Sequence, residues 1–184
     1  MGELVVPTGC PALDELLGGG LGAGTLLLVY GEAETGKTTL ALQLAVNCSA
    51  MGHKVLFVDC EGGLRPERLE ALSGQEPGIL ENISIARPGS FWEQASLVDE
   101  LEKLVPAGLT LVAVDTMTGL YRLELSKGVD AFKLNRELNR QVAMLVQLAR
   151  EHGLAVVMTS QVRAVLRPGP EEHPAGETVE PVAA

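Results

Sequence analysis

The residues best suited to chemistry stand in the segment Gly31-Glu32-Ala33-Glu34-Thr35-Gly36-Lys37-Thr38, which Thr39 follows. Glycines let a backbone pass close to phosphate oxygens, so that successive N–H groups can point at them. A lysine in this pattern can reach the β- and γ-phosphates, and the hydroxyl after it can ligate Mg²⁺. The spacing therefore predicts that the chain binds a nucleoside triphosphate with Mg²⁺, with Lys37 and Thr38 in these two roles.

The flanks of this segment have the periodicity that a phosphate-binding loop requires. The apolar run 25–30 precedes it and is typical of a buried strand. Behind it, Leu40 and Leu44 recur at helical spacing until Gly52 stops the pattern. A helix that begins at the loop directs unpaired N–H groups and partial positive charge at the phosphates. An ordinary glycine turn is the alternative, and the Lys-Thr pair in register disfavours it.

Three polar side chains follow other apolar runs and are expected at the same sheet edge, because parallel strands deliver ligand-binding residues at their carboxyl ends. Asp115 could fix Mg²⁺ by accepting hydrogen bonds from its waters; a helix cap or turn residue is the alternative. Glu61 could take a proton from the water that attacks the γ-phosphate; a solvated loop acid is the alternative. Gln161 could contact the γ-phosphate through its amide.

Strands and helices alternate along the chain, which implies parallel βαβ units with right-handed crossovers and a mainly parallel sheet flanked by helices. A capping box of Ser90 and Glu93 predicts a helix from about Phe91 to Val105. A polar loop is expected at about 121–130, and a flexible or disordered tail at 163–184. The other expected strands are 4–9, 55–59, 83–86, 109–115 and 154–159. Two further helices are expected to begin near Pro11 and near Arg65, and a long helix after the polar loop is expected to end near His152.

Composition limits the class of protein. The 184 residues suit one domain with an aliphatic core, since 46% are hydrophobic and only 3% aromatic. No apolar run approaches the ~18 residues of a membrane span, so the protein is expected to be soluble and cytoplasmic. The net charge of −10 argues against a broad nucleic-acid-binding surface. The three cysteines form no CxxC pair and are expected to be reduced and mostly buried.

Three strings together resemble the RecA-type recombinase ATPases: Gly31–Thr38, 59–68 and 114–118. Within that superfamily the chain is most similar to the RadB family, which are archaeal recombinase paralogues. Shorter matches occur at 9–20, 120–122 and 159–162, so the resemblance covers almost the whole chain. The string Glu-Gly-x-x-Arg-Pro-Glu-Arg that begins at Glu61 discriminates best, because the glycine-rich lead-in also occurs in KaiC-like ATPases.

The resemblance implies a RecA-like P-loop core and a slow, DNA-dependent ATPase that mediates recombination by binding DNA, a RadA-type recombinase, or both. It implies Glu61 as the catalytic carboxylate, Gln161 as a γ-phosphate sensor, and Asp115 on Mg²⁺ through water. It also implies Arg68 against the adenine. The remaining implied nucleotide contacts are Gly31, Glu32, Ala33, Glu34, Thr35, Gly36, Lys37, Thr38 and Thr39.

The resemblance further implies two DNA-facing loops, at about 123–130 and after Val162. Cations in and beside these loops make a local basic strip in an acidic chain, which suits phosphate contacts. A solvated surface charge is the alternative for each of them. Aromatic side chains are nearly absent there, so weak, sequence-tolerant binding of single-stranded DNA is expected. The cations are Arg122, Lys127, Lys133, Arg136, Arg140, Arg163 and Arg167.

The chain departs from the family in two places. It is expected to lack an N-terminal helical DNA-binding domain, which favours the RadB family over the strand-exchange enzymes. Family members also continue beyond the second loop, so the C-terminal strands of the sheet are expected to be lacking. Two other functions stay open: a KaiC-like or bacterial RadA-like ATPase, and a nucleotide-gated scaffold for protein binding with vestigial catalysis.

Overall fold

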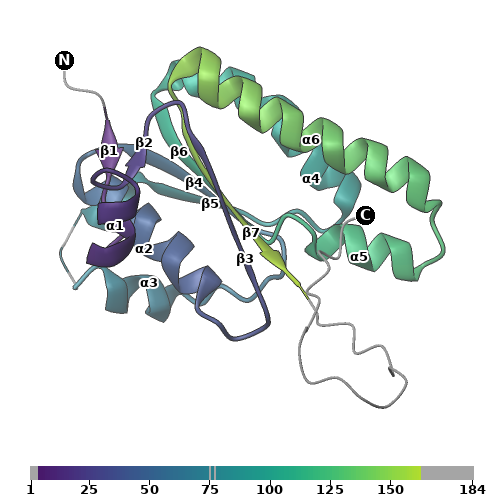
Figure 1. Ribbon diagram of the computed structural model, residues 1–184, viewed down its shortest axis with the longest axis horizontal. Coiled ribbons are helices and arrows are strands. Elements are labelled where there is room, and N and C mark those ends of the chain that lie inside the picture. Colours follow the sequence, from purple (N-terminus) through teal and green to yellow (C-terminus); the bar gives the residue numbers. More distant parts are fainter. Residues whose placement is uncertain (1–3, 75, 77, 163–184) are drawn as a thin grey trace, which may run out of the picture.

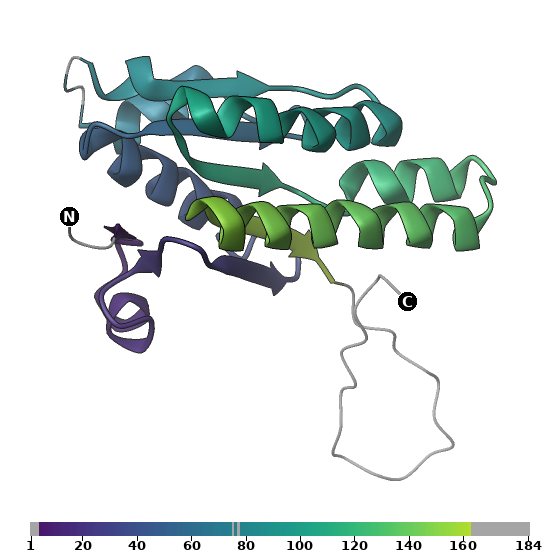
Figure 2. The ribbon, with the colours of Figure 1, turned by 90° about the horizontal axis from the view of Figure 1, so that it is seen from above.

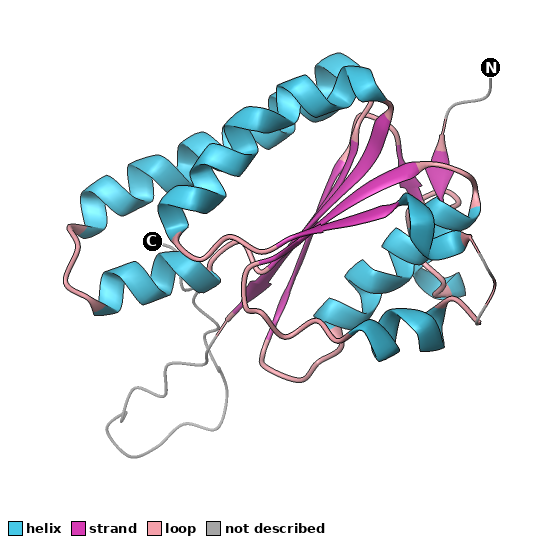
Figure 3. Ribbon diagram, turned by 180° about the vertical axis from the view of Figure 1, so that it is seen from behind, coloured by secondary structure: helices cyan, strands magenta, loops and turns pink. Residues whose placement is uncertain are grey.

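A five-stranded parallel sheet with helices on both faces forms the centre of the computed structural model, which describes residues 4–74, 76 and 78–162 (Figure 1). This confirms the predicted α/β architecture. In spatial order the strands are β3 (Leu26–Gly31), β7 (Ala155–Gln161), β6 (Leu109–Asp115), β4 (Lys54–Asp59) and β5 (Ile83–Ala86). One face carries α2 (Lys37–Ala50) and α3 (Pro66–Leu72); the other carries α4 (Phe91–Leu104), α5 (Gly119–Ser126) and α6 (Ala131–His152) (Figure 3).

The two faces have separate hydrophobic cores because successive side chains of a strand point in opposite directions. On β4, Val55 and Phe57 pack towards α2, whereas Leu56 and Val58 pack towards α4 and α6. Helices α4 and α6 lie alongside each other over this second core (Figure 2). Full burial of a side chain as large as Phe57 stabilises the fold by roughly 1.5–3 kcal/mol. The packing therefore fixes the central strands, and with them the edge at which they end.

Helix ends follow their sequence signals. The predicted capping box at α4 is confirmed, since the Glu93 amide donates to the Ser90 hydroxyl at 3.2 Å and the Glu93 carboxylate accepts from the Gly89 amide at 2.7 Å. Asp130 caps α6 by accepting from the Phe132 amide at 2.8 Å. Two short 3₁₀ turns were not predicted: η1 (Ile79–Asn82) and η2 (Val105–Ala107).

The strand before the phosphate loop is not buried as predicted. β3 lies at the edge of the sheet, and Leu28 and Tyr30 on it are 49% and 65% exposed. An apolar run predicts a strand but not its place in the strand order. The lead-in is also shorter than predicted: β1 (Val5–Val6) pairs antiparallel with an unpredicted β2 (Leu21–Gly22), and α1 (Pro11–Leu16) lies between them.

The prediction of a polar loop at 121–130 was wrong, because residues 121–126 belong to α5. Leu120, Tyr121 and Glu124 form the buried face of this helix. The Tyr121 hydroxyl also donates to Asn135 Oδ1 on α6 at 2.6 Å, which anchors α5 to its neighbour. Charged residues between these positions obscured the helical spacing. Only a short turn separates α5 from α6.

Two of the three cysteines are buried, and Cys10 is exposed. Burial raises the pKa of Cys48 to about 12, and burial, reinforced by the Asp115 carboxylate, raises that of Cys60 to about 12. Since the thiolate is the reactive form, we expect a disulfide-exchange reagent at pH 8 to modify one thiol per folded chain quickly and all three after unfolding. Cys10→Ser should remove the fast phase; a fast phase that survives would contradict this assignment.

No helix in the described part of the chain is both long and apolar enough to cross a membrane.

Candidate functional site

The loop between β3 and α2 has a shape that depends on two glycines. Gly36 adopts φ +89°, a conformation that L side chains rarely adopt. A Cβ on Gly31 would lie 3.0 Å from Thr35 Oγ1, which itself donates to the Glu32 carbonyl at 2.9 Å. The backbone therefore curls tightly, and α2 begins immediately after it at Lys37. Such a loop places backbone N–H groups and a helix N-terminus at one point, as an anion requires.

Four cationic or hydroxyl side chains meet at this loop and the first turn of α2. The Lys37 ammonium donates to the Glu32 carbonyl and to Thr35 Oγ1, the latter at 3.3 Å. Arg68, on α3, donates from Nη2 to Thr39 Oγ1 at 2.6 Å, so it lies over the first turn of α2. A cavity of about 420 Å³ opens here, lined by Val29, Tyr30, Gly31, Thr35, Gly36, Lys37 and Leu40.

Strand register brings the other predicted residues to the same edge. Gln161 on β7 pairs directly with Gly31, the last residue of β3. On the far side of β7, Asp115 at the end of β6 pairs with Asp59 at the end of β4. Glu61 follows β4 by two residues. The structure thus places the phosphate loop, Asp115, Glu61 and Gln161 along one carboxyl edge, where open α/β sheets bind ligands.

Asp115 is a buried carboxylate, only 6% exposed. Thr159 Oγ1 donates to its Oδ1 at 2.5 Å. Burial raises the pKa of the Asp115 carboxyl above its ordinary value, while hydrogen bonds from Thr159 and Thr38 act in the opposite direction. The Thr38 hydroxyl of α2 is therefore close to this carboxylate. A buried acid next to a hydroxyl is a donor set that suits a hydrated divalent cation, whose charge would offset the desolvation of the carboxylate.

Asp59 organises the loop that carries Glu61, a role that sequence reasoning missed. Its buried carboxylate accepts from the Gly63 and Leu64 amides at 3.2 and 3.1 Å. It also pairs with Arg87 Nε at 3.2 Å. The available signal was that the strand 55–59 ends on an acid just as the strand 109–115 does. Asp59 thereby fixes the backbone beyond Glu61.

The Glu61 side chain is half exposed and has two polar neighbours. Its Oε1 accepts from Thr116 Oγ1 at 3.0 Å and lies 3.7 Å from Arg122 Nη2. The same Arg122 nitrogen donates to Gln161 Oε1 at 3.0 Å. Arg122, predicted as a DNA contact, therefore lies between the two predicted catalytic groups, and its side chain is only 21% exposed. Sequence reasoning gave no role to Thr116.

Acidic partners interrupt the predicted basic strip. Lys127 pairs with Glu124 at 2.8 Å, and Arg140 pairs with Asp99 at 2.6 Å and Glu137 at 2.8 Å. Lys133 lies over the ring of Trp92, 5.2 Å from its centroid, and Arg136 is exposed on α6. Arg163 and Arg167 lie outside the described residues. The described strip therefore carries less net positive charge than its sequence indicates.

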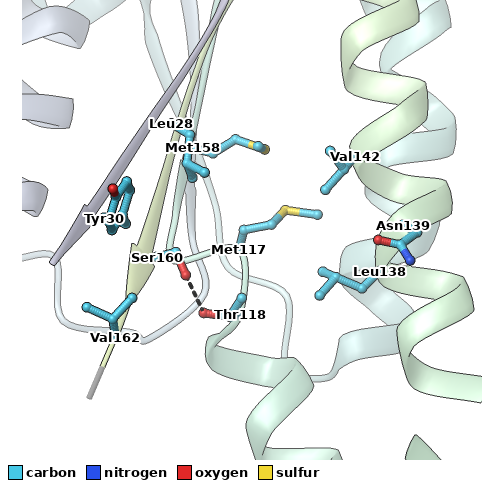
Figure 4. A pocket seen from close by; sticks show the side chains of 10 residues that line it. All are labelled: Leu28, Tyr30, Met117, Thr118, Leu138, Asn139, Val142, Met158, Ser160 and Val162. Atoms are coloured by element: carbon cyan, nitrogen blue, oxygen red, sulfur yellow. Dashed lines mark hydrogen bonds between the residues drawn. The ribbon is translucent and has the colours of Figure 1, made fainter. Parts of the chain in front are cut away.

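A second cavity, of about 490 Å³, lies between helix α6 and the edge strand β3 with its neighbour β7 (Figure 4). Its walls are mainly aliphatic, with Leu28, Met158 and Val142 on opposite sides. Two of its lining residues, Thr118 and Ser160, lie next to each other and share a hydrogen bond of 3.2 Å (Figure 4). None of its lining residues is charged, so it lacks the cationic donors that a triphosphate requires.

Comparison with known proteins gives concordant matches. The profile of the Rad51 family matches residues 3–183. Three archaeal relatives are each named DNA repair and recombination protein RadB. The one from Methanococcoides burtonii is 37% identical, over 95% of this chain and 77% of the relative. The one from Archaeoglobus fulgidus is 38% identical, over 98% of this chain and 80% of the relative. The one from Thermococcus gammatolerans is 40% identical, over 86% of this chain and 70% of the relative.

Proposed function

The chain belongs to the Rad51 family, and from this premise we propose that it is an ATP-binding, slowly ATP-hydrolysing mediator of DNA repair and recombination. The observation that carries the proposal is the meeting of the phosphate loop with Asp115, Glu61 and Gln161 at one edge of the sheet. Its similarity to archaeal RadB proteins favours this function over that of a KaiC-like ATPase.

The phosphate loop would hold the triphosphate of ATP. Backbone N–H groups of 31–37 and the N-terminus of α2 would surround the phosphates, and Lys37 would turn from the Glu32 carbonyl to the β- and γ-phosphates. Arg68 projects over the start of α2 from α3, so it is suitably placed for the nucleoside end of the ligand.

Thr38 and Asp115 would hold Mg²⁺, Asp115 through a water molecule. Their closeness supports this role, as does the desolvation of the carboxylate, which a cation would offset. When bound, Mg²⁺ neutralises the charge that develops on the phosphates during transfer. Thr159 fixes the orientation of the Asp115 carboxylate by donating to its Oδ1.

Glu61 would accept a proton from the water that attacks the γ-phosphate, and Gln161 would contact that phosphate. Gln161 ends the strand next to the loop, and Glu61 follows β4 at the same edge of the sheet. Thr116 holds one Glu61 oxygen, so that the other is available to water. Because the Glu61 side chain is 49% exposed, water is incompletely controlled at this point, which is consistent with slow turnover.

The partners would be DNA, a RadA-type recombinase, or both, and the DNA contacts would be few. Lys133 and Arg136 lie near the start of α6, directly after the turn that follows α5. Because phosphate contacts do not read the bases, they should give similar affinity for all DNA sequences, and this affinity should fall as the salt concentration rises. The relatives are archaeal proteins named for DNA repair, and such a role requires access to DNA in the cytoplasm, so we propose a cytoplasmic location.

The proposal is tested by ATP hydrolysis with and without single-stranded DNA at two salt concentrations. We expect slow turnover that DNA stimulates at low salt and hardly at high salt. Replacing Lys133 and Arg136 together by alanine should remove the stimulation and reduce the salt dependence, while Arg150→Ala at the far end of α6 serves as a matched control. Turnover that is unaffected by DNA, with ATP still bound, would support the second candidate.

The second candidate is a nucleotide-gated scaffold with vestigial catalysis. The acids that pair with Lys127 and Arg140 favour it, as does the net charge of −10, because both weaken attraction to a polyanion.

A further inference from the structure

Arg122 occupies the space between the two side chains that would act on the γ-phosphate. A single nitrogen, Nη2, donates to Gln161 Oε1 at 3.0 Å and lies 3.7 Å from Glu61 Oε1. The other terminal nitrogen, Nη1, is buried and has no hydrogen-bond partner among the described residues. A guanidinium held in this way is unlike a solvated surface cation, and it is poorly placed to reach DNA.

The contact to Gln161 determines what the amide can do. An amide offers one oxygen acceptor and one NH₂ donor. Because Arg122 has no acceptor, it can bind only the oxygen, and the NH₂ group must then point elsewhere. Gln161 pairs in register with Gly31, so this NH₂ group stays beside the phosphate loop, where a phosphate oxygen would accept from it.

The helix that carries Arg122 also connects to Glu61. Thr116, which donates to Glu61 Oε1, stands just before α5, and the Arg122 amide donates to the Thr118 carbonyl in the first turn of that helix. α5 then runs directly to the turn before α6, beside which Lys133 and Arg136 lie. A shift of α5 would therefore move Arg122 against both Glu61 and Gln161.

We propose that Arg122 is a positioning residue that orients Gln161 and Glu61 for ATP and connects both to helix α5. This inference rests on the proposed function, since it assigns Arg122 to the same nucleotide site. It also replaces the predicted role of Arg122 as a direct DNA contact.

The test compares Arg122→Ala and Arg122→Lys with the parent chain for affinity to ATP and ADP, by calorimetry with Mg²⁺, and for single-turnover hydrolysis. ADP affinity should change by less than about twofold, since the lost contact concerns the γ-phosphate alone. The preference for ATP over ADP should fall roughly tenfold, the effect of losing one charge-assisted hydrogen bond. Arg122→Lys should not restore the preference, because an ammonium lacks the planar fork of a guanidinium.

Two further measurements distinguish positioning from a structural role. Free guanidinium ion should restore part of the hydrolysis rate of Arg122→Ala but not that of Arg150→Ala, which should match the parent throughout. Combining Arg122→Ala with Gln161→Ala should lower the ATP preference no further than Gln161→Ala alone, because both changes remove the same interaction.

The outcomes separate this inference from the proposed function. An Arg122→Ala variant with the parent's ATP preference and rate would overturn the inference and leave ATP binding intact. Equal loss of ATP and ADP affinity, a lowered melting temperature and no response to guanidinium would also overturn it, in favour of a structural role. A parent chain that binds neither nucleotide would instead overturn the proposed function.

Discussion

Replacing Lys37 by alanine should weaken ATP binding by roughly a hundredfold. The ammonium would make charge-assisted contacts to the β- and γ-phosphates, and contacts of this kind contribute about 1.5–3 kcal/mol. Gly36 would still end the loop and α2 would still begin after it, so the backbone N–H groups would retain part of the affinity. Calorimetric titration with ATP and Mg²⁺ measures the loss directly.

Lys54→Ala provides the matched control. Lys54 is the first residue of β4, so it lies at the amino ends of the strands, away from the phosphate loop at their carboxyl ends. Its ammonium donates to the Ala107 carbonyl at 2.8 Å. Both variants lose one lysine charge, so the difference between their ATP affinities reports on the position of the lysine and not on net charge. Equal ATP affinity in the two variants would show that the loop 31–38 does not hold the triphosphate.

The central fold could be predicted because local pattern and tertiary packing agree there. The runs 55–59 and 109–115 are aliphatic throughout, and both strands lie inside the sheet with both faces covered. Turn and capping residues also predicted the ends of helices correctly. Ser90 caps α4, and Gly153, at φ +67°, follows the last residue of α6. Where every level points to one structure, sequence reasoning is reliable.

Two failures of prediction have one cause, which is that packing against distant residues decides them. The run before the phosphate loop has the composition of a buried strand, yet no local signal shows that β3 lies at the sheet edge. The sequence of α5 predicts a loop because charged residues such as Arg122 and Glu124 are typical of solvated segments. Both turn inward, Arg122 towards Gln161 and Glu124 into the buried face of the helix.

In the candidate site as well, local sequence predicts some features, and contacts with distant residues decide the others. Strand ends and the family resemblance together predicted that Lys37, Thr38, Asp115, Glu61 and Gln161 share one edge of the sheet, and the structure brings them there. Their roles at that edge remain predictions. The groups that hold them in place come from elsewhere: Thr159 bonds Asp115, Thr116 bonds Glu61, and Asp59 bonds the loop after Glu61. Such partners have no fixed spacing from the residues they orient. The basic strip was overestimated for the related reason that ion pairs such as Arg140 with Asp99 join separate helices.

Replacing Glu61 by glutamine should leave ATP affinity within about threefold of the parent and lower the rate of hydrolysis by roughly a hundredfold or more, the contribution of a positioned general base. The amide keeps the size of the side chain and an oxygen that can accept from Thr116, so the local geometry is conserved. It removes the negative charge that would take up the proton. The loss should therefore appear in turnover and not in binding.

Single-turnover measurement of phosphate release, with protein in excess over ATP, is required because the parent rate is expected to be slow. Glu102→Gln, on the exposed surface of α4, removes the same charge away from the site and should match the parent in both measurements. If Glu61→Gln hydrolyses ATP as fast as Glu102→Gln, then Glu61 is not the base. The remaining carboxylates at this edge could not readily replace it, since Asp115 is buried against Thr159 and Asp59 is engaged by two backbone amides and Arg87. Hydrolysis that persisted in the variant would then favour phosphate-assisted attack by water over catalysis by a protein base.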